Sequence, residues 1–193
     1  MRIMIRTAGA TFAGLLLIGL MTGCMSPSGV TVEEKRQTYQ QMRADTLAEL
    51  YEIHPQARNE IASSVGYGTF SNIGIYLFLL STGSGWGIVH DQETGKDTYM
   101  KMFTVGIGIG LGVKDFRGIF IFTERGALDR FVEEGWQAGG QADAAAISGE
   151  KGEAFAGAID VAPGIKLYQI TEHGLALMAT IQGTKFWKDD DLN

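Results

Sequence analysis

The stretch from Val105 to Val113 reads VGIGIGLGV, in which glycine alternates with an aliphatic residue over nine positions. Because successive side chains of a β-strand point to opposite faces, this pattern predicts a strand with one aliphatic face and one bare face. A bare face lets another backbone, an aromatic ring or an acyl chain approach closely. We expect the protein's own helix or aromatic residues to pack there, and a lipid slot is the alternative. The spacing of Gly106, Gly108 and Gly110 does not fit the dinucleotide-binding G-x-G-x-x-G turn, and no helix follows it.

The residues on both sides of this stretch also follow a β pattern. The candidate strands are Thr69–Leu80, Trp86–His90, Thr98–Val113, Gly118–Thr123, Trp136–Ser148, Ala154–Val161, Ile165–Thr171 and Leu175–Gly183. The turn signals between them are TGSG from Thr82, ETGK from Glu93, APG from Ala162 and EHG from Glu172. One helix, from about Glu124 to Glu133, interrupts the series. Sequential strands with short turns predict an α+β fold, with N-terminal helices packed on a strongly curled or closed, mainly antiparallel β-sheet that is barrel-like, and one further inserted helix.

The run from Ile73 to Leu80 contains no charged residue. As part of a strand it would be buried in the sheet, and as an exposed loop it would form a patch able to dip into a membrane. We expect burial.

Two helices are predicted before the first strand. Thr31 and Glu34 form a T-x-x-E capping box, which is typical of a helix start. Apolar residues then recur on one helical face, at Tyr39, Met42, Leu47, Leu50 and Tyr51. The helix should end near His54, because Pro55 disfavours a helical residue before it. Pro55 can itself open a second short helix that runs through Ile61 and Ala62.

The N-terminus has the pattern of a lipoprotein signal peptide. Arg2 and Arg6 precede an apolar run that is too short to span a bilayer, and the run ends in LMTGC at Cys24. LMTGC resembles the lipobox, so we expect cleavage of residues 1–23 and attachment of acyl chains, palmitate among them, to Cys24. The alternatives are an ordinary secretory peptide or an uncleaved anchor. Cys24 is the one cysteine of the chain, which excludes an internal disulfide.

Acylation of Cys24 predicts a location and a domain layout. Two or three acyl chains hold a protein at a membrane effectively permanently. Met25 and Ser26 follow the cysteine, and the absence of an aspartate at the second position favours an outer membrane, with the domain facing the periplasm. Residues 24–30 would form a short tether and residues 31–193 a single domain.

The charge of the chain excludes one class of partner. Removal of residues 1–23 takes Lys+Arg from 16 to 14 against 22 Asp+Glu, which gives a mature net charge of −8. The phosphate backbone repels such a protein, so we expect no nucleic-acid partner.

No catalytic or metal-binding pattern is present in the sequence. His54, His90 and His173 belong to no H-E-x-x-H motif, and neither C-x-x-C nor G-x-S-x-G occurs. The acidic run Asp189–Asp191 is typical of a solvated terminus. We therefore expect a non-enzymatic protein without cofactor or metal.

Four segments resemble the SYLF domain, a lipid-binding module of bacterial lipoproteins and of eukaryotic adaptors of the actin cytoskeleton. They read AELYEIHPQARNEIASSVGYGTF, IGIGLGVKDFRGIFIFTERGALDRF, GWQAGGQADAAA and GIKLYQITEHGLALMATIQGTKFW, within about residues 46–188. The segment TFSNIGIYLFLL departs from the family pattern because it lacks a Phe-Pro pair. The resemblance implies the fold and a lipid-associated role.

The phosphoinositide binding of eukaryotic members is not carried over, because it uses a basic N-terminal helix. Here the corresponding helix contains Lys35, Arg36 and Arg43 but also four acidic residues, so it is not basic. Each basic residue near an anionic surface contributes about 1 kcal/mol, which those acids would offset. The remaining candidates for head-group contact are Lys101, Lys114, Arg117, Lys166, Lys185 and Lys188, with Phe186 and Trp187 as interfacial anchors.

Two main hypotheses of function follow, and an envelope hydrolase is a weaker third. In the first, the protein is a membrane-anchored lipoprotein of the cell envelope whose domain binds phospholipid. In the second, the domain binds another envelope protein and lipid serves only as the tether. The first predicts vesicle binding by the unacylated domain and the second does not.

Overall fold

The computed structural model describes residues 29, 31–137, 157–171, 174–175 and 183–193, and among these it describes the side chains except at 73–81, 106–116, 171 and 174–175. The elements are α1 (Val32–Ile53), α2 (Ala57–Ala62), β1 (Gly66–Asp91), β2 (Asp97–Phe122), α3 (Arg125–Glu133), β3 (Trp136–Gln137), β4 (Ile159–Ala162), β5 (Ile165–Thr171), β6 (Gly174–Leu175) and β7 (Thr184–Lys188). The described strands form one seven-stranded sheet in which every pairing is antiparallel. The predicted α+β fold with a curled antiparallel sheet is therefore confirmed.

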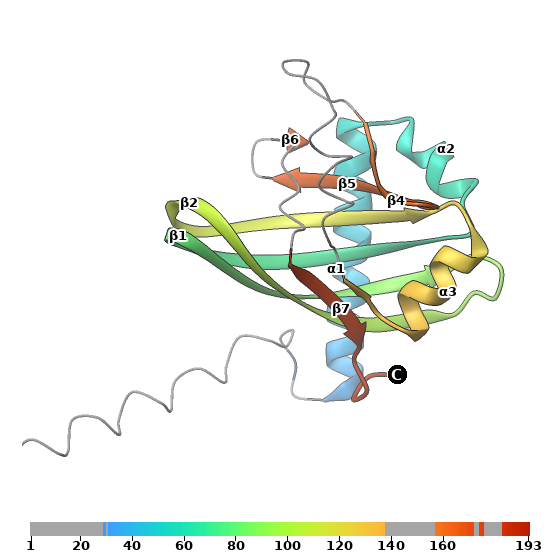
Figure 1. The fold of residues 1–193 in the computed structure, drawn as a ribbon. Helices are drawn as coiled ribbons and strands as arrows, with labels where there is room; N and C mark the ends of the chain where they lie inside the picture. Colours follow the sequence, from blue (N-terminus) through green and yellow to red (C-terminus); the bar gives the residue numbers. More distant parts are fainter. Residues whose placement is uncertain (1–28, 30, 138–156, 172–173, 176–182) are drawn as a thin grey trace, which may run out of the picture.

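A long hairpin of β1 and β2 forms the frame of the sheet. Its register runs from the pair Gly66 and Phe122 to the pair His90 and Asp97, and it shifts between Phe78 and Leu80. Both strands bend back on themselves near this shift, so that the bend itself extends away from the helices (Figure 1). A bulge of this kind increases twist and kinks the strand.

The prediction of four separate strands in this region is wrong. Thr82 and Gly83, expected in a turn, lie within β1 and pair with Val105 and Thr104. The glycines of this segment have a different use. A Cβ atom on Gly85 would overlap the backbone oxygen of Ser71, and one on Gly87 would overlap the ring of Phe70. Glycine here lets the two arms of the bent β1 pack closely together.

The bend divides the sheet into two halves. The β5 half contains β4, β5 and the arms of β1 and β2 that pair near Gly66 and Phe122. The β7 half contains β3, β7 and the arms that pair near His90 and Asp97.

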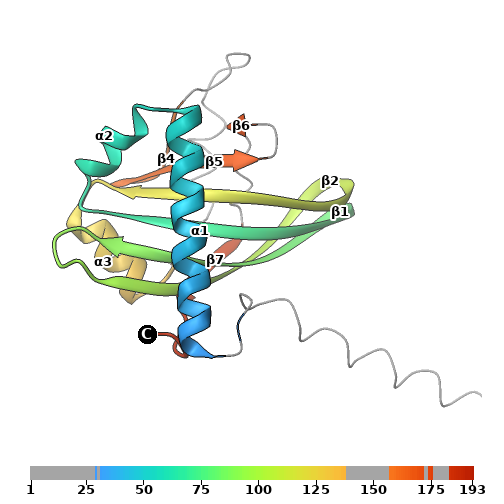
Figure 2. The same ribbon diagram turned by 180° about the vertical axis from the view of Figure 1, so that it is seen from behind.

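The inner face of the curled sheet carries the main core. Phe120 and Phe122 point inward, and so do Met102 and Phe186 of the β7 half. The apolar face of α3, including Leu128 and Phe131, packs on them. Figures 1 and 2 show that α3 and α1 lie on opposite faces of the sheet. The predicted helix from Glu124 to Glu133 is confirmed as α3, which begins one residue later and ends at the same residue.

The helix α1 crosses the outer face of both halves (Figure 2). At one end Leu50 packs with Ile119, Ile121, Tyr168 and Ile170 of the β5 half. At the other end Tyr39 packs with Ile88, Tyr99 and Leu192 of the β7 half. The predicted capping box of Thr31 and Glu34 is present, and the helix ends before His54 as Pro55 predicts. The second short helix is confirmed as α2, which packs Ala57 and Ile61 on the same outer face.

The later strands are confirmed in part. β5 has its predicted bounds, and the turn before it contains Gly164 with a φ of 75°. Parts of the predicted strands Trp136–Ser148, Ala154–Val161 and Leu175–Gly183 lie outside the described residues, as does the predicted turn at Glu172. β7 was not predicted from the sequence. The backbone of Val105–Val113 lies in β2, and the side-chain surroundings of Ile73–Leu80 and of Gly106, Gly108 and Gly110 lie outside the described part.

Candidate functional site

Three of the eight candidates for head-group contact, Lys101, Lys185 and Trp187, lie together on the outer face of the β7 half. Lys101 of β2 is the register partner of Trp187 of β7, and the neighbouring pair is Phe103 and Lys185. These residues face outward because Met102 and Phe186, which alternate with them, lie in the inner core. We call Lys101, Phe103, Val105, Lys185 and Trp187 the β2–β7 outer surface.

Two apolar side chains of this surface are exposed. Phe103 is 38% exposed and Val105 is 49% exposed, although both belong to a strand with a buried inner face. Trp187 is half-buried and Lys185 is exposed. Phe103 and Val105 were not predicted as site residues, because the alternation of the strand shows that they share a face with Lys101 but not that this face is uncovered.

Lys101 contacts two acidic side chains near the end of the chain. Its Nζ lies 2.7 Å from Asp189 and 3.5 Å from Asp191. Burial on its own would lower the pKa of Lys101, but its contacts with Asp189 and Asp191 raise the pKa above its usual value. Lys185, by contrast, has no ion-pair partner among the described residues, so it is the freer cation of this surface.

The structure corrects two sequence expectations at the C-terminus. Phe186 is 1% exposed and part of the inner core, so it cannot be an interfacial anchor. Asp189 is 3% exposed and accepts a hydrogen bond from the Tyr39 hydroxyl at 3.4 Å, so the acidic run is not simply a solvated terminus.

The other basic candidates do not join this surface. Arg117 lies on the β5 half, 3.5 Å from Glu49 of α1. Lys166 is on β5 opposite Asp160 of β4, and Lys188 pairs with Glu133 of α3. The side chain of Lys114 lies outside the described part. The described cations therefore form separate contacts rather than one basic patch.

The basic residues of α1 bind within the protein. Arg36 donates two hydrogen bonds to the carbonyl oxygen of Leu192, at 3.0 and 2.7 Å. Arg43 lies 2.7 Å from the Asp97 carboxylate, which also contacts His90 at 2.7 Å. These contacts hold α1 on the β7 half. Because Arg36 and Arg43 are engaged in them, the two side chains do not form a basic outer face on α1.

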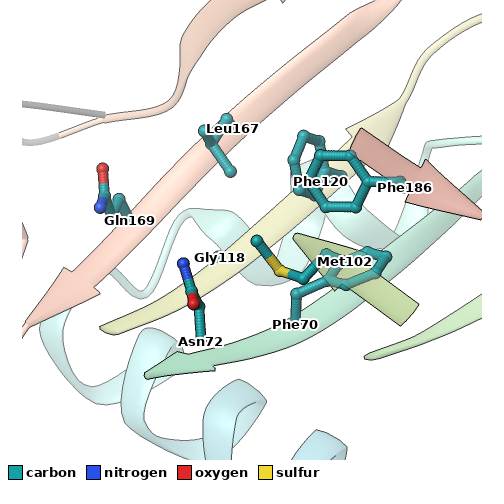
Figure 3. Close-up of a pocket in the computed structure, with 8 residues that line it drawn as sticks. All are labelled: Phe70, Asn72, Met102, Gly118, Phe120, Leu167, Gln169 and Phe186. Carbon is teal, nitrogen blue, oxygen red and sulfur yellow. The ribbon is translucent and has the colours of Figure 1, made fainter. Parts of the chain in front are cut away.

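A cavity opens on the inner face of the sheet (Figure 3). Its walls are the apolar side chains Phe70, Met102, Phe120, Leu167 and Phe186. Asn72, Gly118 and Gln169 line one end, and the aromatic rings lie at the other end (Figure 3). The centre of a water-sized sphere can move through about 30 Å³ of it.

Two side-chain amide oxygens at this cavity have no hydrogen-bond partner in the described part of the chain. Asn72 is 3% exposed, and its Oδ1 atom has no hydrogen-bond partner among the described residues. The Oε1 atom of Gln169 is likewise buried and unpartnered there. A buried polar group without a partner destabilises a fold by about 1–3 kcal/mol, so two of them at one cavity are unusual.

A second, polar cleft of about 160 Å³ lies between the β1–β2 turn and α3. Its main feature is Arg125 of α3, which donates to both carboxylate oxygens of Asp91 at 2.8 and 2.9 Å and to Asp129 at 2.6 Å. Two parallel bonds of this kind are strong and directional. The cleft is thereby explained as a clamp between the turn and α3.

Among the described residues, no three His, Cys, Asp or Glu side chains come together in a way that could hold a metal ion. No helix in that part of the chain is both long enough and apolar enough to cross a membrane.

The chain has a clear relative among characterised proteins. It is 33% identical over 162 residues to the protein named Beta cell expansion factor A of Aeromonas veronii, so the two are homologues. The match covers 84% of this chain and 60% of that protein, so this chain spans about three fifths of the length of its relative. No family model matches the chain.

Proposed function

We propose that this protein is a lipid-anchored lipoprotein of a bacterial outer membrane, with a non-enzymatic SYLF-type domain that contacts lipid through the β2–β7 outer surface. The exposure of Phe103 and Val105 beside Lys185 and Trp187 carries this proposal. Exposed apolar side chains with a tryptophan and lysines at their rim are typical of contact with the membrane interface.

The SYLF assignment is supported by three observations together. The resemblance extends over about 140 residues, the fold is α+β as the resemblance implies, and the homologue matches most of the chain.

The position of the proposed anchor supports the same surface. The start of α1 lies beside the C-terminus, where Arg36 binds the carbonyl of Leu192, and Asp189 in that same segment binds Lys101. The start of α1 and the β2–β7 outer surface therefore lie at one end of the domain. A tether of residues 24–30 spans at most about 25 Å. Acylated Cys24 would hold this end of the domain close to the bilayer.

The lipid contact is tested by co-sedimentation of the unacylated chain from residue 24, carrying Cys24→Ser, with phosphatidylcholine vesicles and with anionic vesicles. We expect weak binding, weaker still to anionic vesicles because of the mature charge of −8. The Phe103→Asp, Val105→Asp double variant should lose the binding. Ile53→Asp is the matched control, since Ile53 is 41% exposed at the opposite end of α1.

A salt series separates the two physical contributions. Contact through Lys185 should fade as salt rises, because the Debye length is only about 8 Å at physiological salt, whereas apolar insertion should persist. Tight, salt-insensitive binding by the double variant would contradict the proposal and make Ile75–Leu80 the next candidate. Absence of binding by the parent chain would favour the alternative, an interaction lipoprotein that uses lipid only as a tether and binds another envelope protein.

The anchor is tested separately. A Cys24→Ala variant should lose metabolic acyl label and leave the membrane fraction, because no other thiol can accept the lipid. Unchanged labelling of this variant would refute the lipoprotein assignment.

A further inference from the structure

The side chains of the β2–β7 outer surface follow one another in a fixed order along the strands. β7 runs from the side of the bent ribbon toward the C-terminus, antiparallel to β2 (Figure 1). In this direction the exposed Val105 comes first, and Phe103, whose register partner is Lys185, comes next. Lys101 follows, and Asp191 of the segment after β7 lies beside it. The surface therefore passes from apolar to basic to acidic side chains.

One cation and one anion of this surface remain for an external ligand. The Nζ atom of Lys101 lies 2.7 Å from Asp189, whose side chain is 4% exposed, so the charge of Lys101 is compensated within the protein. Asp191 lies farther from Lys101, at 3.5 Å, and its side chain is 84% exposed. An exposed ion pair of this length contributes little, so the Asp191 carboxylate can accept another partner. Lys185 is exposed and has no ion-pair partner among the described residues.

The register places the two charges within the span of one lipid head group. Lys185 and Trp187 are two residues apart on β7, and Lys101 is the register partner of Trp187. With a rise of about 3.3 Å per residue and about 4.8 Å between strands, the Cα atoms of Lys185 and Lys101 lie about 8 Å apart. Because Asp191 lies beside Lys101, its carboxylate is on the order of 10 Å from the Lys185 ammonium. A phosphate and an ammonium joined by two carbons, with an ion pair of up to about 4 Å at each end, cover this distance.

We propose that this surface binds a phospholipid with a zwitterionic head group that carries a primary ammonium beyond its phosphate, as phosphatidylethanolamine does. This inference rests on the proposed lipid contact and names the class of lipid. The acyl region would contact Val105 and Phe103, the phosphate would pair with Lys185, and the ammonium would donate to Asp191. From the bilayer interior outward, the apolar, negative and positive parts of the lipid then meet the apolar, basic and acidic parts of the surface in the same order.

The two charges distinguish this head group from others. Anionic lipids such as phosphatidylglycerol have no positive group for Asp191, and the mature net charge of −8 repels their surface. Choline is positive but has no N–H group, so it cannot donate a hydrogen bond to a carboxylate. A primary ammonium has three N–H donors, and a hydrogen bond between charged groups is roughly twice as strong as a neutral one. A zwitterion with a primary ammonium is therefore the best match.

The experiment is co-sedimentation of the unacylated chain from residue 24, carrying Cys24→Ser, with three kinds of vesicle. They consist of phosphatidylcholine alone, of phosphatidylcholine with an equal amount of phosphatidylethanolamine, and of phosphatidylcholine with an equal amount of phosphatidylglycerol. We expect the partition constant to be about threefold higher with phosphatidylethanolamine than with phosphatidylcholine alone, which is the range of one exposed ion pair. The partition constant should be lowest with phosphatidylglycerol.

Asp191→Asn tests the contact with the ammonium. This variant should lose the preference for phosphatidylethanolamine and keep its binding to phosphatidylcholine within about twofold of the parent. Asp190→Asn is the matched control, because Asp190 is the exposed neighbour, forms no ion pair among the described residues and gives the same change of charge. It should keep the preference of the parent. Phosphatidylethanolamine also alters the packing of a bilayer, and an effect of packing would be the same in both variants.

Lys185→Gln tests the contact with the phosphate. Because both zwitterionic lipids carry a phosphate, this variant should bind both kinds of vesicle about threefold more weakly and leave the ratio between them unchanged. Lys96→Gln is the matched control, since Lys96 is an exposed lysine in the turn between β1 and β2. It should bind as the parent does.

Four results would overturn the inference. Equal binding of the parent with and without phosphatidylethanolamine would leave the lipid contact in place but remove the choice of head group. A preference that persists in Asp191→Asn would mean that the packing of the bilayer causes it. Tightest binding to phosphatidylglycerol would identify an anionic lipid as the ligand. Absence of binding to all three vesicles would overturn the lipid contact together with the choice of head group.

Discussion

The inner faces of the two halves of the sheet both pack into the main core, whereas their outer faces differ. In the β5 half, Ile119, Ile121, Tyr168 and Ile170 point outward, and each is at most 2% exposed because α1 and α2 cover them. In the β7 half, α1 covers Ile88 and Tyr99 but reaches no farther along β2, so Phe103 and Val105 stay exposed.

The fold of the β7 half does not require apolar residues at positions 103 and 105. In an antiparallel strand with one face in solvent, the outward positions normally carry polar residues. The β7 half retains Phe103 and Val105 at such positions next to Lys185 and Trp187. Burial beneath α1 and α2 therefore accounts for the apolar outer face of the β5 half, whereas the lipid contact proposed above would account for that of the β7 half.

The largest effect is expected where the two halves meet. A Cβ atom on Gly87 would overlap the ring of Phe70 and approach the carbonyl oxygen of Thr69, both in the other arm of β1. Gly87→Val should therefore force the arms apart and destabilise the domain by about 3 kcal/mol or more, at the upper end of overpacking effects. Chemical denaturation measures this loss.

The matched control for that variant is Gly118→Ala, since its added carbon meets only ordinary contacts on the inner face. Its unfolding free energy should stay within about 1 kcal/mol of the parent. If Gly87→Val were as stable as this control, the halves would not be closed by glycine contacts.

A smaller effect should separate the two outer faces directly. Ile121→Thr removes a buried methyl group and buries a hydroxyl beneath α1 and α2, so we expect a loss of about 3 kcal/mol. Val105→Thr makes a similar change at a side chain that is 49% exposed, so stability should change by less than about 0.5 kcal/mol. Equal losses in thermal or denaturant melts would mean that Val105 is covered in solution.

Local signals in the sequence predicted the elements that local chemistry determines. The capping box at Thr31, the helix end before Pro55 and the turn at Glu93 depend on residues within a few positions of one another, and all are present. The same reasoning read the glycines of TGSG as a turn. Both lie in β1, and at Gly85 a Cβ atom would overlap the backbone oxygen of Ser71 in the opposing arm, a contact that no local signal predicts.

The candidate site could be predicted less well, for related reasons. TKFWK contains the alternation that β7 uses, with Thr184 and Phe186 inward, but five residues beside an acidic run give a weak strand signal. Lys101 and Trp187 could be chosen from the sequence by their residue type, but only the pairing of β2 with β7 shows that they are neighbours. The cavity had one signal, since the amides of Asn72 and Gln169 occur within apolar strand segments, and the fold places both on the inner face.

The smallest effects on stability are expected for the two ion pairs that hold α1 on the two halves. On the β7 half, Arg43 lies 2.7 Å from Asp97, and these side chains are 19% and 22% exposed. On the β5 half, Arg117 lies 3.5 Å from Glu49, and these are 34% and 42% exposed. The longer, more exposed pair should contribute little, so Glu49→Gln should change the unfolding free energy by less than about 0.5 kcal/mol.

Asp97→Asn should have a somewhat larger effect, and that effect should depend on pH. Burial on its own would raise the pKa of Asp97, but hydrogen bonds from Gln40, His90 and Arg43 lower it below its usual value. A carboxylate with a lowered pKa in the folded state stabilises the fold above its unfolded pKa of about 3.9, and this contribution is lost as pH falls through the folded pKa. We expect Asp97→Asn to lose about 1 kcal/mol at pH 7, because the pair is partly exposed to solvent. The difference between parent and variant should shrink as the pH of denaturant titrations is lowered from 6 toward 2, whereas the Glu49→Gln difference should stay near zero throughout. A difference for Asp97→Asn that is constant with pH would mean that its carboxylate does not hold α1 on the β7 half.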